Sequence, residues 1–208
     1  MSEDKAYNRE LVEKVIELGK MLLAFGLVER ATYHEDQTTA ETDTTHTVML
    51  GIMASAYASK FAPYLDTGKI AQFALVHDLV EVYAGDTISL GKKGEDTEKK
   101  EREEAALARI HQEYGEMFPW IPETIEAYEK LSSPEARFVK VFDKVLPKIV
   151  HLLTKGVTVK ELGHTRASMI DFHEYQFDKL GKTYGADQKE AMELLALINA
   201  EASTLEIE

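Results

Sequence analysis

The sequence predicts an all-α protein of seven or eight helices in one domain. Apolar residues recur at spacings of three and four along nearly all of the 208 residues, as in helices that bury one face. No alternation of apolar and polar residues lasts long enough to build a sheet. No internal repeat or linker divides the chain, so we expect a single domain over residues 1–208.

The first half of the chain is predicted from its apolar pattern. An early apolar run indicates the first helix: Leu11, Val15, Leu18, Leu22 and Leu23. Residues 30–45 are polar and β-branched, so we expect a loop there. Residues 45–61 form the next helix. Residues 69–82 are almost continuously apolar, which predicts a helix buried on most sides.

Three segments follow with clear boundary signals. Residues 84–96 contain three glycines and are expected to form a loop. Residues 97–114 are rich in strong helix formers and charged on one face, which predicts an exposed amphipathic helix. Ser133 precedes Pro134, a cap residue before a proline that suits the first helical position. That pair predicts a helix over residues 134–153.

Residues 156–208 have a helical pattern but no motif that indicates chemistry. Two capping-box pairs predict helix starts in this region: Thr158 with Glu161, and Asp187 with Glu190. We therefore expect these helices to pack on the domain or to form a homodimer.

The composition excludes several classes of protein. The chain has no cysteine, so a metal must be held by nitrogen and oxygen ligands. A formal charge of −13 argues against a nucleic acid polymer as partner, although it allows a small phosphorylated substrate. No stretch approaches the roughly 20 apolar residues that span a bilayer, and the charged N-terminus is unlike a signal peptide. We expect a cytoplasmic protein with no membrane partner.

Three ionisable residues gather in the apolar segment 69–82. His77 and Asp78 are adjacent, and Glu81 follows one helical turn later, on the same helix face. Burying these groups without partners would destabilise the fold by several kcal/mol. A divalent cation would offset that penalty. The alternative is a partly exposed face with ordinary salt bridges.

Two more residues complete a potential ligand set. His46 lies near the start of its helix, and Asp143 lies in a strongly apolar one. Two imidazoles and two carboxylates suffice to bind one divalent metal ion. Taken singly, His46 is also explained as a capping or core histidine, and Asp143 as a partner of Lys140 or Lys144.

The order of these residues resembles the HD-domain superfamily of metal-dependent phosphohydrolases, and in particular the branch of bacterial 5′-deoxynucleotidases and their eukaryotic relatives. The resemblance covers about residues 20–155 and rests on ETDTTHTVML, HDLVEVYAGDT, EKKEREEAALARI and SSPEARFVKVFDK. It implies one divalent ion (Mn²⁺, Co²⁺, Zn²⁺, Fe²⁺ or Mg²⁺). The metal ligands would be His46, His77, Asp78 and Asp143, whereas Glu81 and Asp86 would serve catalysis and substrate binding.

Details within these motifs narrow the choice of subfamily. A lysine three places after the His-Asp pair would indicate a cyclic-dinucleotide phosphodiesterase, and Glu-Asp there a guanosine-tetraphosphate hydrolase; here Glu81 is followed by Val82. The deoxynucleotidases have an arginine and an aromatic about fifteen residues before the first histidine. Here Arg30 is followed by Ala31, so phosphate binding by Arg30 is expected but deoxyribose selectivity is not. As a surface cation, Arg30 would instead pair with Glu29 or Glu35.

The function that the resemblance implies is removal of the 5′-phosphate from (deoxy)nucleoside monophosphates by metal-activated water. One alternative is hydrolysis of nucleoside triphosphates or another small phosphorylated metabolite, for which Lys92 and Lys93 are the extra cations that the sequence offers. The other is a non-catalytic, metal-stabilised module that binds nucleotides.

Overall fold

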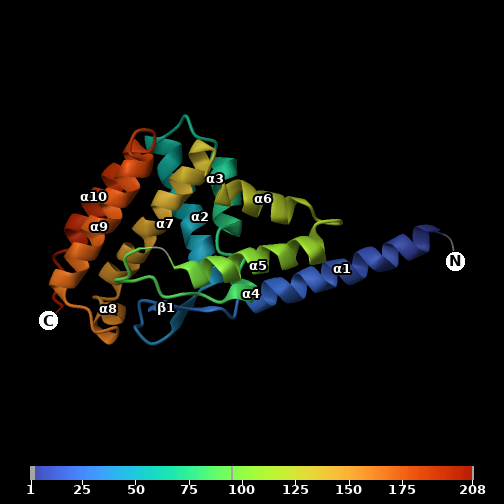
Figure 1. Cartoon of the computed structure of the whole chain (residues 1–208), viewed down its shortest axis with the longest axis horizontal. Coiled ribbons are helices and arrows are strands. Elements are labelled where there is room, and N and C mark those ends of the chain that lie inside the picture. Colours follow the sequence, from blue (N-terminus) through green and yellow to red (C-terminus); the bar gives the residue numbers. More distant parts are fainter. Residues whose placement is uncertain (1–2, 95, 208) are drawn as a thin grey trace.

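A computed structural model describes residues 3–94 and 96–207, with side chains from residue 8 onward. These residues form ten helices and one β-hairpin, which confirms the all-α class (Figure 1). The elements in chain order are α1 (Glu3–Phe25), β1 (Glu29–Tyr33), β2 (Ala40–Thr42), α2 (Asp43–Phe61), α3 (Thr67–Val76), α4 (Glu81–Ala84), α5 (Thr97–Tyr114), α6 (Trp120–Glu129), α7 (Pro134–Leu153), α8 (Val157–Glu161), α9 (Arg166–Tyr184) and α10 (Lys189–Ala202).

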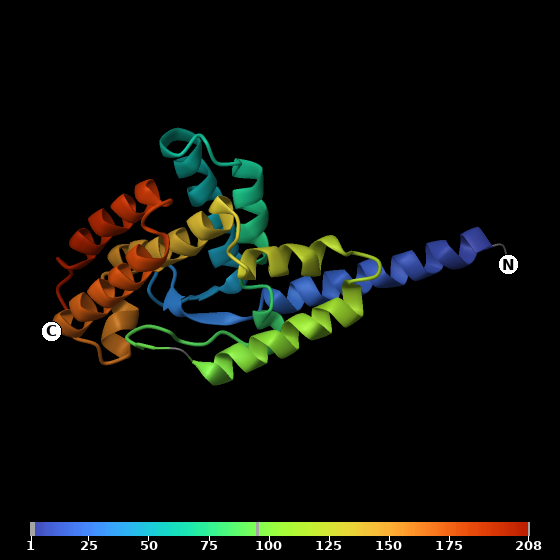
Figure 2. The same cartoon turned by 45° about the horizontal axis from the view of Figure 1, so that its top comes forward.

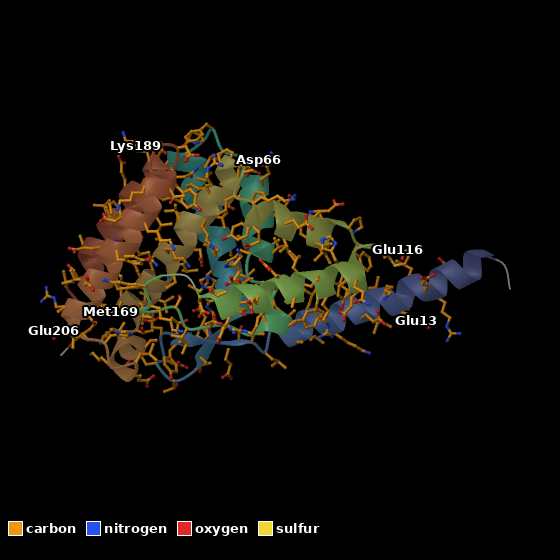
Figure 3. The ribbon with its side chains drawn as sticks, viewed as in Figure 1. Glu13, Asp66, Glu116, Met169, Lys189 and Glu206 are labelled. Carbon is orange, nitrogen blue, oxygen red and sulfur yellow. The ribbon has the colours of Figure 1, made fainter. Side chains whose placement is uncertain are left out.

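A central group of helices (α2, α3 and α7) is flanked on both sides (Figures 1 and 2). On one side α10 packs against α7 and α9 against α10, which places the C-terminal helices on the domain as the packing alternative expected. On the other side lie α4, α5 and α6, and the first half of α1 extends away from the body. In Figure 3 Glu13 and Glu116 lie toward that extended end, and Met169 and Glu206 lie toward the opposite end.

The largest core cluster joins α2, α3, α6, α7, α9 and α10. Leu50, Phe138 and Leu146 are almost completely buried in it. Burial of each such side chain contributes about 1.5–3 kcal/mol to stability, before the loss of conformational entropy. This cluster fixes α2, α3 and α7: His46 lies on α2, Asp143 lies on α7, and His77 and Asp78 directly follow α3.

The two helices with the clearest local signals begin and end where the sequence predicts. The Asp96 side chain accepts a hydrogen bond from the Lys99 backbone N–H at the start of α5. The Ser133 side chain accepts one from the Ala136 N–H at the start of α7. In both cases the cap satisfies a donor that the helix itself leaves unpaired.

The loop prediction for residues 30–45 was wrong in part, because β1 and β2 form an antiparallel hairpin within it. At its tip, Asp36 accepts hydrogen bonds from the backbone N–H groups of Thr38 and Thr39. Gln37 has a positive φ of 62° there. Such turns are stabilised by an aspartate side chain, and the β-branched content of the segment suits strands.

The single helix predicted over residues 69–82 was also wrong. Helix α3 ends at Val76, and α4 begins at Glu81. Between them the backbone forms bonds three residues apart, from the Leu79 N–H to the Val76 carbonyl and from the Glu81 N–H to the Asp78 carbonyl. A tightened turn of this kind within a helical segment often lies at a functional site. Here it carries the His-Asp pair.

Neither C-terminal capping box forms, because both capping residues have tertiary partners. The Thr158 hydroxyl donates to the carbonyl of Ala31 at 3.0 Å, and Asp187 pairs with Arg137 at 2.7 Å. Helices α8 and α10 therefore start without a side-chain cap. Within the described ranges, no helix combines the length and the apolar character needed to cross a membrane.

Candidate metal centre and its cleft

The four expected ligands converge although they come from separate elements. His46 lies on α2, His77 and Asp78 follow α3, and Asp143 lies on α7. Each offers one ligand atom, and these atoms all lie within 4.8 Å of one another. The two histidines and Asp143 are buried, whereas the Asp78 side chain is 19% exposed. The geometry brings together what the sequence proposed as one set.

His77 is oriented by its own helix. Its Nδ1 lies 2.8 Å from the Ala74 carbonyl, so Nδ1 carries a proton and donates it. Its Nε2 lies 2.9 Å from Asp78 and 3.7 Å from Asp143, yet has no aligned hydrogen-bond partner. Burial lowers the pKa of His77, but the two carboxylates outweigh burial and raise that pKa to about 10. The site thus favours a positive charge at Nε2.

A divalent cation fits this donor set. Nε2 of His77 has no hydrogen-bond partner and lies close to carboxylate oxygens of Asp78 and Asp143. Nε2 of His46 lies 3.1 Å from a carboxylate oxygen of Asp143. Two imidazole nitrogens and two carboxylates are ligands that first-row divalent ions accept. Without a cation, both histidines would have to be protonated, because the lone pair of a neutral imidazole nitrogen would otherwise face a carboxylate oxygen. Ligation itself stays a prediction.

Behind His46 lies a carboxylate that the sequence analysis did not single out. Glu41 Oε1 lies 3.7 Å from His46 Nδ1, and neither atom has a hydrogen-bond partner. The other oxygen of Glu41 accepts a hydrogen bond from Thr32. A carboxylate behind a ligating histidine fixes the ring and its tautomer. Glu41 could be recognised only from the folded structure, because the β1–β2 hairpin that precedes α2 places it behind His46.

Replacing Glu41 with Gln is expected to weaken metal binding about 10- to 100-fold, because the amide no longer holds the His46 ring by charge. Equilibrium dialysis against Mn²⁺ or Zn²⁺ measures the change without any assay of turnover. Glu35→Gln, in the exposed tip of the same hairpin, is the matched control and should bind metal as the original protein does. Equal affinities of the two variants would contradict the orienting role.

Arg30 lies in the site rather than on the surface. One of its guanidinium nitrogens is 2.9 Å from Asp43 and 2.9 Å from Asp78. The pairing with Glu29 or Glu35 considered from the sequence was therefore wrong. Asp43, Asp78 and Glu81 form a second close carboxylate group, and Arg30 supplies positive charge to it. From there the guanidinium can bind a phosphate oxygen, which stays a prediction.

Glu81 is almost fully buried beside this group. Its Oε1 accepts a hydrogen bond from Lys99 at 3.3 Å, and its Oε2 has no partner. Burial and then the charge of Asp78 raise the pKa of Glu81 to about 10, against the opposing effect of Lys99. At neutral pH a carboxyl with this pKa holds its proton, and the positive charge of a divalent ion in the adjacent ligand cluster would lower the pKa of Glu81 toward the range that general-base catalysis requires. Its catalytic role stays a prediction.

A cleft opens from the metal centre and contains the remaining predicted site residue. Asp86, in the loop after α4, lines it together with Arg30, Glu81 and Asp143. Asp143 also pairs with Lys144 at 2.7 Å, so the salt bridge considered from the sequence exists beside the metal geometry rather than instead of it. The structure thus places every predicted site residue at the centre or in its cleft.

The cations that line this cleft differ from those expected. Lys92 and Lys93 do not line it, and Lys93 pairs with Asp171 on α9. Apart from Arg30, the cleft is lined by three lysines: Lys99 and Lys148, to which the sequence analysis gave no role, and Lys144, which it named only as a possible partner of Asp143. Nothing in their local sequence distinguishes them from the chain's other cations, since packing of α5 and α7 brings them to the cleft.

The fold and this cluster define an all-α domain in which two histidines and two carboxylates that could hold a metal ion lie beside a cleft. Residues 27–183 match the sequence model described as the HD domain, and the chain belongs to that family. The match extends further toward the C-terminus than residue 155, the limit of the resemblance seen in the motifs.

The chain is similar to known proteins in sequence and in fold. It is 30% identical over 141 residues to the human protein 5′-deoxynucleotidase HDDC2; the match spans 67% of this chain and 63% of the human protein, less than two thirds of that relative's length. Its fold also matches a solved structure described as a predicted metal-dependent phosphohydrolase from Magnetospirillum magnetotacticum MS-1. That match has a TM-score of 0.70 and 26% identity, and covers 92% of this chain and 93% of the other.

Proposed function

We propose that the chain is a metal-dependent phosphomonoesterase that removes the 5′-phosphate from nucleoside or deoxynucleoside monophosphates. The observation that carries the proposal is the convergence of His46, His77, Asp78 and Asp143, of which the two carboxylates line the same cleft as Arg30. The similarity to a protein named 5′-deoxynucleotidase supports the choice of substrate. The aromatic missing after Arg30 leaves deoxyribose selectivity outside the proposal.

In this proposal the four clustered residues hold one divalent ion, Mn²⁺, Co²⁺, Zn²⁺, Fe²⁺ or Mg²⁺. A divalent ion supplies two effects in phosphate hydrolysis: it acidifies water and it polarises the phosphoryl group. The chain's own residues do the rest. Glu81 accepts the proton of the attacking water, Arg30 binds phosphate oxygens and balances their developing charge, and Asp86 contacts the leaving oxygen or a sugar hydroxyl.

In this reaction the oxygen of water forms a bond to phosphorus while the bond between phosphorus and the 5′-oxygen breaks. The leaving 5′-oxygen takes a proton, and the products are a nucleoside and inorganic phosphate.

A cytoplasmic location, a homodimer and the absence of a nucleic acid or membrane partner stay predictions from the sequence.

The test is release of inorganic phosphate from a panel of nucleoside and deoxynucleoside 5′-monophosphates. Metal-stripped protein should release none, and addition of Mn²⁺, Co²⁺, Zn²⁺, Fe²⁺ or Mg²⁺ should restore release with at least one ion. Triphosphates and small sugar phosphates in the same panel test the other hydrolase alternatives. Bound metal with no release from any compound would overturn the proposal and favour a non-catalytic module that binds nucleotides.

A further inference from the structure

The cleft has two ends of different charge. All four carboxylates that line it lie in the region of the metal centre: Asp78, Glu81, Asp86 and Asp143. The lining continues along α7 and α9 to a second set without a carboxylate: Lys148, His151, His173 and Gln176. In a protein with a formal charge of −13, an end that offers N–H donors and no acid is unusual.

Lys148 dominates this second end. It is 3% exposed, and its ammonium group donates to the Lys144 carbonyl and to Gln176 Oε1. Within the described part of the chain, no carboxylate oxygen lies within 4.0 Å of it. A buried cation without a counterion destabilises the folded state. Burial and the charge of Lys144 accordingly lower the pKa of Lys148 to about 7.

Two buried histidines accompany Lys148. His151 is 4% exposed, and its Nδ1 has no hydrogen-bond partner. His173 comes from α9 and is 6% exposed. Burial and the neighbouring Lys148 lower the pKa of His151 to about 4, so its ring is neutral and offers one N–H donor at neutral pH. Among the described residues, the set therefore combines a buried ammonium group and two imidazoles with no carboxylate among the residues that line this end.

We propose that this end of the cleft, formed by Lys148, His151, His173 and Gln176, binds a second anionic group of the substrate, so that a nucleoside bisphosphate binds better than a monophosphate. The inference rests on the proposed function for the identity of the first phosphate site. The set contains an ammonium group and imidazole N–H donors but no carboxylate, and a phosphate group, which presents acceptors alone and carries negative charge, matches it better than a nucleobase edge does.

The spacing along α7 supports two phosphates on one sugar. Lys148 lies five residues after Asp143 and His151 lies eight residues after it, which corresponds to about 7–12 Å along the helix axis. Adjacent phosphates of an anhydride are closer than this. Phosphates on different carbon atoms of one ribose, as in a nucleoside 3′,5′-bisphosphate, are of the right order. Phe172 and Pro147 line the cleft as apolar surface for the nucleoside.

The test compares the affinities of adenosine 3′,5′-bisphosphate and adenosine 5′-monophosphate by titration calorimetry. The full chain is used in its metal-stripped form, in which no turnover consumes either nucleotide. We expect the bisphosphate to bind at least tenfold more tightly. Lys148→Met should reduce that ratio about tenfold, and His173→Leu, which enters from α9, should reduce it too. Lys92→Met makes the same substitution outside the cleft and should leave the ratio unchanged.

Equal affinity for the two nucleotides, or a folded Lys148→Met protein with the original ratio, would overturn the second anion site. A ratio that falls equally in Lys92→Met would do the same, because it would reflect overall charge. These outcomes are separate from a failure of the proposed function, which would appear as absent phosphate release with the binding ratio intact.

Discussion

Asp78→Asn is expected to eliminate most metal binding and to reduce phosphate release by about 10³-fold or more. Asp78 is one of only two carboxylates in the ligand cluster, and it also contacts Arg30 at 2.9 Å. A catalytic divalent ion supplies several kcal/mol of transition-state stabilisation, and about 4 kcal/mol corresponds to a factor of 10³ in rate. Metal content per chain and phosphate release, measured on the same preparation, check both parts.

Asp171→Asn is the matched control for this change. It removes the same charge from an exposed position on α9, where Asp171 pairs with Lys93 outside the cleft. Both variants should fold, which circular dichroism verifies. If Asp78→Asn kept one tightly bound ion per chain and substantial release, the ligand set would have to be drawn from other residues.

The parts of the fold that the sequence predicts well are those with local causes. Helices α5 and α7 begin at the predicted residues, where Asp96 and Ser133 accept hydrogen bonds from backbone donors within the first turns of their own helices. The missed features have tertiary causes. The hydroxyl of Thr158 bonds to β1 instead of capping α8, and the His-Asp pair lies in a tightened turn that periodicity cannot distinguish from a continuous helix.

The residues of the candidate site likewise fall into those with a local sequence signal and those without one. His46, His77, Asp78 and Asp143 could be selected because an ionisable residue in an apolar segment is conspicuous and because the spacing resembles a known family. Glu41 and Lys148 had no such signal. Glu41 matters through its position behind His46, and Lys148 through its burial beside α9, and both positions arise only when distant elements pack together.

Glu81→Gln is expected to reduce phosphate release by about 10²–10⁴-fold while leaving the metal bound. Glutamine fills nearly the same volume and still accepts the hydrogen bond from Lys99, but it cannot take a proton. A proton acceptor that is not a metal ligand is needed for turnover but not for metal binding, so the substitution should affect turnover alone. Metal content and kcat, measured together, decide the point.

Glu103→Gln offers an unusually close control, since Lys99 contacts Glu103 at 3.2 Å and Glu81 at 3.3 Å. If Glu81 acted only by holding Lys99 in place, the two variants would be similarly impaired. If Glu81 is the proton acceptor, Glu103→Gln stays near the original rate and only Glu81→Gln loses turnover. Full turnover by Glu81→Gln would assign proton transfer to another group, and among the residues that line the cleft Asp86 would be the first to test.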